Sequence, residues 1–185
     1  MLLIDLQTRV RIALTNTLVD EWSLFSPTAG SSSPSERTVA FHLGWNLLPL
    51  VERAWSIDCE YDRSGMALED VVAFGGETNR IPDLIVHQRG KLGPEHNLLL
   101  LELSADYATK GATAGDFGHA QAIQKRFGYA YAVLVDLHLG ADPDGQPRPT
   151  WHWSTLEGGP VTREPMDVYT PEVLASILSR GATRK

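Results

Sequence analysis

The chain has little of what would place it in several common classes of protein. It holds one cysteine, Cys59, among 185 residues, which excludes an intramolecular disulfide and a zinc site built from several cysteines. No apolar run approaches the roughly 20 residues that span a bilayer, and the N-terminus lacks the basic stretch of a signal peptide. We therefore expect a cytoplasmic protein with no membrane-spanning segment, which also fits a lone cysteine.

Positive charge is also scarce. Lys and Arg together number 16 and Asp and Glu number 23, which gives a formal net charge of −7. Non-specific coating of nucleic acid needs clustered basic residues, so this composition excludes it, although a small metal-assisted site on nucleic acid remains compatible. The apolar content of 43% and charged content of 21% are typical of a globular chain. The length favours a single domain over residues 1–185.

The spacing of apolar residues predicts a mixture of helices and strands. Helices are expected over residues 5–22, 34–48, 116–127 and 170–180. Strands are expected over residues 56–63, 82–87, 97–104, 129–137 and 151–155. The second helix has Ser33 as its expected N-cap, with Glu36 completing a capping box. Residues 97–104 are nearly all apolar, which is typical of a central strand, and residues 151–155 are expected at an edge. This order predicts an α/β sandwich with a mixed sheet.

Two acids lie where apolar strands should not tolerate them. Glu102 is deep within NLLLLELS, the most apolar strand, and Asp83 follows Pro82 at the start of another. A buried carboxylate must be paired, protonated or bound to metal. Carboxylates from adjacent strands form the hard oxygen site that suits Mg²⁺ or Mn²⁺, so we expect both to point into one cleft. The alternative is an ion pair of Glu102 with one of three arginines: Arg37, Arg63 or Arg80.

These residues resemble the PD-(D/E)XK nuclease superfamily, which has the restriction-endonuclease-like fold. The resemblance rests on RIPDLIVHQRG followed by NLLLLELS, with SERTVAFHLGWNLLPLVE and SIDCEYDR before them and GYAYAVLVDL after them. It implies an αβββαβ core with a mixed central sheet flanked by helices, extended here by N- and C-terminal helices. It also implies Asp83 and Glu102 as metal ligands for Mg²⁺ or Mn²⁺, with Glu36 as a third acid.

The sequence departs from this family at one position. The family has a lysine two residues after the glutamate, where this chain has Ser104. Serine can donate a hydrogen bond but supplies no charge to the developing phosphorane. Three residues could supply the missing cation, namely Lys110, His119 and Lys125, and each also fits a surface position.

Two functions follow as expectations from this pattern. The first is a Mg²⁺-dependent nuclease that hydrolyses nucleic-acid phosphodiesters, with DNA favoured over RNA as the substrate and with Asp83, Glu102, Ser104 and Glu36 in its site. The second is a catalytically inactive module of the same fold that binds nucleic acid or a protein partner. A homodimer is left open, and so is an unrelated α/β protein in which Glu102 is only ion-paired. Trp151 and Trp153 share a strand face and fit core packing or a base-stacking platform.

Overall fold

The protein is an α/β structure with a six-stranded mixed sheet flanked by helices. This computed structural model describes residues 1–25, 34–60, 81–105, 114–138 and 149–161. The helix expected over residues 170–180 lies outside these ranges. None of the described helices is both long enough and apolar enough to cross a membrane.

Helices and strands follow one another in nearly the expected order. The helical elements are α1 (Leu3–Asp20), α2 (Trp22–Phe25), α3 (Glu36–Leu47), the 3₁₀ turns η1 (Leu48–Leu50) and η3 (Pro94–His96), and α5 (Ala114–Phe127). The strands are β1 (Ser56–Cys59), β2 (Leu84–His87), β3 (Asn97–Ser104), β4 (Tyr131–Asp136), β5 (Thr150–Thr155) and β6 (Gly159–Pro160).

The strands lie in the order β1-β2-β3-β4-β5-β6. The β3–β4 pair is parallel and every other neighbouring pair is antiparallel. A parallel pair needs a crossover connection, and the segment containing α5 makes it. The prediction of a central strand is confirmed for β3, which lies between β2 and β4 and is buried along its length except at Ser104.

The prediction of β5 as an edge strand is wrong. The two-residue strand β6 pairs beyond it, with Ser154 opposite Pro160 and Thr155 opposite Gly159. A strand of two residues carries no alternation of apolar and polar side chains, so no pattern could indicate it.

The start of α3 also differs from the expectation. Ser35, and not Ser33, is the N-cap, and its side-chain oxygen accepts a hydrogen bond from the Thr38 N–H at 3.1 Å. A capping box needs its glutamate three residues after the cap. Glu36 is instead the first helical residue, where its negative charge lies at the positive end of the helix dipole.

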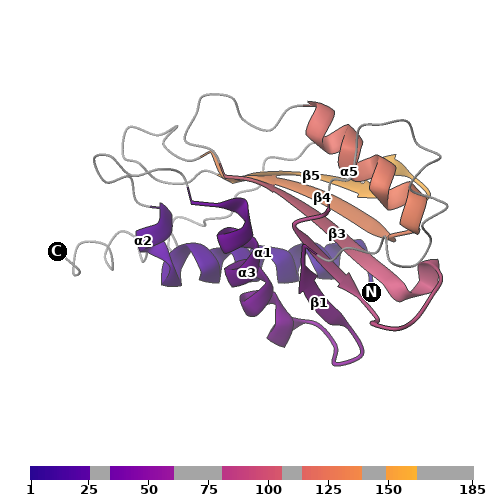
Figure 1. Cartoon of the computed structure of the whole chain (residues 1–185), viewed down its shortest axis with the longest axis horizontal. Coiled ribbons are helices and arrows are strands. Elements are labelled where there is room, and N and C mark those ends of the chain that lie inside the picture. Colours follow the sequence, from indigo (N-terminus) through magenta and orange to yellow (C-terminus); the bar gives the residue numbers. More distant parts are fainter. Residues whose placement is uncertain (26–33, 61–80, 106–113, 139–148, 162–185) are drawn as a thin grey trace.

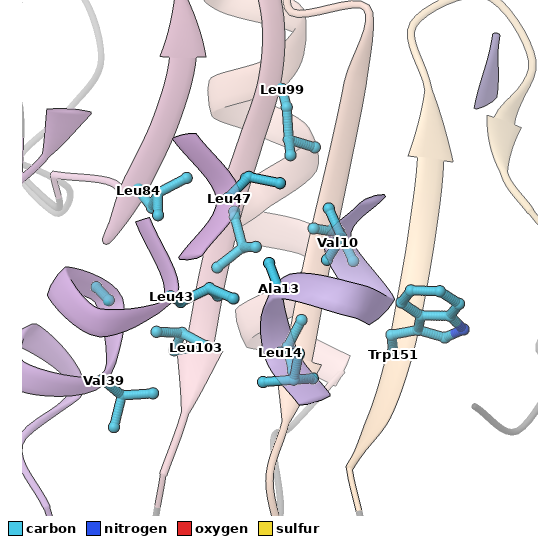
Figure 2. Packing of buried hydrophobic residues seen from close by; sticks show 14 of the residues in the cluster. Val10, Ala13, Leu14, Val39, Leu43, Leu47, Leu84, Leu99, Leu103 and Trp151 are labelled. Atoms are coloured by element: carbon cyan, nitrogen blue, oxygen red, sulfur yellow. The ribbon is translucent and has the colours of Figure 1, made fainter. Parts of the chain in front are cut away.

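The helices cover the two faces of the sheet, with α5 on one face and α1 and α3 on the other (Figure 1). The larger core lies between the α1–α3 layer and the sheet. Figure 2 shows Val10 and Leu14 of α1 and Leu43 of α3 packed near Leu99 of β3 and Trp151 of β5. Trp151 and Trp153 are both buried in this core, which confirms core packing for the pair.

Candidate functional site

The candidate site lies on the face of the sheet that α5 covers. Leu100 of β3 packs under α5 in a small cluster with Ile85 and Ala132. Side chains alternate along a strand, so Glu102 and Ser104 lie on the same face as Leu100. Glu102 is 8% exposed, which confirms that a carboxylate sits in the buried part of this strand.

Asp83 lies beside Glu102. The β2–β3 ladder pairs Leu84 with Leu101 and Ile85 with Leu100, so one further step of the same register sets Asp83 opposite Glu102. Asp83 Oδ2 also accepts a hydrogen bond from the main-chain N–H of Leu103 at 2.7 Å. The two acids therefore lie on neighbouring segments of the sheet, Asp83 directly before β2 and Glu102 within β3. The expectation that their carboxylates point into one cleft stays a prediction. Their role as metal ligands stays a prediction.

The next strand contributes an acid that the sequence analysis did not single out. Asp136 is directly opposite Ser104 in the parallel β3–β4 pair and is 4% exposed. Its Oδ1 atom accepts a hydrogen bond from the His138 N–H at 3.1 Å, and His138 Nδ1 is 3.6 Å from the same oxygen. The His138 Nε2 atom lies 2.8 Å from Thr150 Oγ1. The residue that stands in place of lysine therefore has a buried carboxylate as its neighbour.

One signal for Asp136 was available in the sequence. The run from Tyr131 to Val135 is apolar and ends in an acid, as the run before Glu102 does. The pairing of Asp136 with Ser104 required the register across the α5 crossover, which spacing along one strand does not give.

Helix α5 separates the two candidate cations that it carries. The Asn97 side-chain amide donates to the Phe127 carbonyl at 2.6 Å, so the C-terminal end of α5 lies at the first residue of β3. Glu102 is five residues further along, about 16 Å at the usual rise of a strand. Lys125 is exposed and near that C-terminal end, so the helix does not bring it to the two acids.

His119 is better placed. It lies one helical turn before Ile123, which packs against the cluster that contains Ile85 and Leu100. Helix α5 runs antiparallel to β3, with its C-terminal end at the first residue of that strand. The turn that contains His119 is therefore nearer to Asp83 and Glu102 than Lys125 is. Both ring nitrogens of His119 are shielded from solvent. The third candidate, Lys110, lies outside the described residues.

Glu36 and Arg37 belong to the opposite layer. Both are in the first turn of α3, whose buried face packs in the α1–α3 core. Arg37 forms an ion pair with Glu60, with Nε and Glu60 Oε1 2.6 Å apart, and this contact raises the pKa of its guanidinium. Arg37 is thus engaged with Glu60, while Arg63 and Arg80, the other arginines considered for Glu102, lie outside the described residues.

A second charged cluster lies further along β1 and β2. Asp58 Oδ2 is 2.7 Å from His87 Nε2 and accepts a hydrogen bond from Arg89 Nε at 2.8 Å. Burial acts to raise the pKa of Asp58, but the bonds and charges of Arg89 and His87 outweigh it and leave the pKa below its ordinary value. His87 is 2% exposed and bound to Asp58.

The donor set at Asp83 and Glu102 fits a hard divalent cation in type and number. Mg²⁺ is commonly held by one or two carboxylates while it keeps several waters, so two carboxylates side by side suffice for it. Within the described ranges, no three His, Cys, Asp or Glu side chains are grouped around one metal position. The role of Glu36 as a third acid, which the family resemblance implies, stays a prediction.

No protein-family model matches this chain, and no significant match was found among curated proteins or solved structures.

Proposed function

We propose that this protein is a divalent-metal-dependent nuclease-like protein with a restriction-endonuclease-like core, acting on nucleic-acid phosphodiesters. The observation that carries the proposal is the hydrogen bond from the Leu103 N–H to Asp83, which holds one carboxylate beside the residue that bears the other. Two acids so placed on a buried part of the sheet form an oxygen site for Mg²⁺ or Mn²⁺.

The order of elements supports the same proposal. Helix α3 is followed by the antiparallel strands β1, β2 and β3, then by the α5 crossover and by β4 parallel to β3. This is the αβββαβ order that the resemblance to PD-(D/E)XK nucleases implies. The acids occupy β3 and the residue before β2, where that resemblance sets them.

The residues have separable roles in this proposal. Asp83 and Glu102 would hold the metal, which when bound supplies Lewis-acid stabilisation of phosphate charge and lowers the pKa of bound water. The main-chain N–H of Leu103 fixes the orientation of Asp83 before any ligand arrives. His119, on the overlying helix, is the described candidate for the positive charge that Ser104 does not supply.

The test is calorimetric titration with Mg²⁺ and Mn²⁺, together with cleavage assays on single- and double-stranded DNA and RNA. Wild type should bind Mn²⁺, and Asp83→Asn and Glu102→Gln should each lose that binding. Asp58→Asn is the matched control, because Asp58 is an acid on β1 that is tied to His87 and Arg89. Equal binding by wild type and both site variants would refute the metal site.

A second candidate function is favoured by the surroundings of Ser104. Its neighbour on β4 is the buried Asp136, so this end of the site carries negative charge where the family has a lysine. This character is expected of a catalytically inactive module of the same fold, because the positive charge that supports catalysis in the family is absent. Nucleic-acid binding without cleavage in either metal would favour it.

A further inference from the structure

An acid, an imidazole and a hydroxyl group meet where β4 ends and β5 begins. Asp136 and Thr150 are directly opposite each other in this antiparallel pair, so their side chains lie on the same face of the sheet. The His138 Nε2 atom is 2.8 Å from Thr150 Oγ1, and His138 Nδ1 is 3.6 Å from Asp136 Oδ1. The acid is 4% exposed, whereas the His138 side chain is 33% exposed and Thr150 is partly exposed. A reagent in solvent can therefore reach the hydroxyl end of this set.

The backbone of His138 holds the imidazole in this place. Its φ angle is 45°, in the left-handed region that residues other than glycine adopt at a conformational cost. Such residues concentrate at functional sites, where the surrounding structure maintains the strain. The main-chain N–H of His138 donates to Asp136 Oδ1 at 3.1 Å, so one buried acid fixes the backbone and also faces the ring. The imidazole is thus oriented before any ligand arrives.

The two ring nitrogens of His138 have different neighbours. A carboxylate on the Nδ1 side favours the tautomer that carries its proton on Nδ1. Nε2 is then the acceptor, and the Thr150 hydroxyl donates to it. A hydroxyl within hydrogen-bond reach of a base, with the base oriented by a third group, is the arrangement that activates a weak nucleophile.

We propose that Thr150 is a nucleophilic site that accepts the acyl group of carboxylic esters with a good leaving group, with His138 as its base. Thr150 Oγ forms a bond to the carbonyl carbon while its proton passes to His138 Nε2. The bond from that carbon to the leaving oxygen breaks, and the leaving group departs as its anion. His138 then returns the proton to water. Neither Asp83 nor Glu102 takes part, so this site is independent of the proposed nuclease function.

The experiment is acetylation of the full chain by p-nitrophenyl acetate, without added metal. Release of p-nitrophenolate gives the rate, and peptide mapping by mass spectrometry locates the acetyl group. Thr150 of the wild type should be acetylated about 10²-fold faster than Thr155, since a positioned general base contributes at least that factor. Thr155 is the internal control because it lies at the other end of β5, where its hydroxyl oxygen accepts a hydrogen bond from the Gly158 N–H.

Three variants assign the roles. His138→Asn should slow acetylation of Thr150 by about 10²-fold, and asparagine tolerates the left-handed backbone of this position. Thr150→Val should lose the adduct, and Thr150→Ser, which keeps a hydroxyl, should retain it. Circular dichroism checks that each variant is folded. No ester on Thr150, equal rates at Thr150 and Thr155, or a rate that His138→Asn leaves unchanged would each overturn the proposal. The contact between His138 and Thr150 would then only join the ends of two strands.

Discussion

The carboxylate of Asp83 accepts a hydrogen bond from the main-chain N–H of Leu103. Asp83 therefore supports the sheet as well as forming part of the candidate metal site. This double role governs how its variants must be interpreted, because a loss of metal binding could follow from a local change in β3.

The two contributions of Asp83 can be separated by two substitutions. Asp83→Asn keeps an oxygen acceptor for Leu103 and removes the charge, so it should lose metal binding and stay close to wild type in stability. Asp83→Ala leaves the N–H of Leu103 without that acceptor, which should cost about 1–3 kcal/mol. Urea unfolding measures the difference. Equal stability of the alanine and asparagine variants would show that the hydrogen bond contributes nothing measurable.

The Asp58 cluster predicts a pH-dependent term in stability. The pKa of Asp58 is lower in the folded chain than its unfolded value of about 3.9, so its contribution is complete above that value. It is lost as the pH falls below about 3.9 and through the folded pKa. Asp58→Asn should cost about 1–2 kcal/mol at neutral pH, discounted because Arg89 is largely exposed.

The pH dependence of the free energy of unfolding tests whether the contribution of Asp58 is lost at low pH. The gap between wild type and Asp58→Asn should narrow as the pH is lowered from 6 toward the acid range, as far as folding persists there. A gap that is constant with pH would mean that the carboxylate charge is not the source of the stability.

Two helical glycines should respond in opposite ways to substitution. A Cβ atom on Gly44 would lie 3.2 Å from Leu84 Cδ1 and 3.3 Å from Ile57 Cγ2, whereas one on Gly118 would meet nothing within 4 Å. Gly44→Val should therefore destabilise the protein by about 1–3 kcal/mol through overpacking. Gly118→Ala should stabilise it by about 0.5–1 kcal/mol, because alanine restricts the unfolded chain and favours helix. Thermal unfolding of both variants tests the pair, and a shift of the same sign in both would contradict it.

Much of the fold could be predicted because the buried strands have long apolar runs. Residues 97–104 and 129–137 contain β3 and β4, and the three- and four-residue spacing over 116–127 matches α5. These patterns are local, and burial on both faces produces them directly. The alternation around Glu102 also indicated which residues share its face.

The contacts of the candidate site could not be predicted, because they depend on which segments of the chain are neighbours in space. The pairing of Ser104 with Asp136 is set by the parallel register across α5. The hydrogen bond from Leu103 to Asp83 joins residues 20 apart in sequence. The N-cap of α3 was wrong by two residues because serines stand on both sides of Pro34 and either could cap. The exposed residues Phe41 and Trp45 alternate in the sequence with buried residues of α3, and only the helical geometry places the two sets on different faces.

The final prediction concerns Ser104 and rests on the proposed nuclease function. Wild type should cleave slowly, because absence of a preorganised cation near the developing phosphorane charge can cost about 10²–10³ in rate. Ser104→Lys should raise metal-dependent cleavage toward that factor. The new ammonium group has a counter-ion at hand in Asp136, which is opposite position 104 on β4, so the variant should fold. Ser104→Met is the matched control, since it adds similar length without charge and should not raise the rate.

The cleavage rates of these Ser104 variants distinguish a nuclease from a binding module. A gain with lysine that disappears in the Ser104→Lys and Glu102→Gln double variant would show that the added charge acts through the metal site. If wild type already cleaves well and Ser104→Lys lowers the rate, the missing charge is supplied from elsewhere, and His119→Ala should then abolish activity. If neither wild type nor Ser104→Lys cleaves any nucleic acid with Mg²⁺ or Mn²⁺, the remaining groups of the site are not competent. The protein would then be a binding module, with a buried acid opposite the position where the family has its lysine.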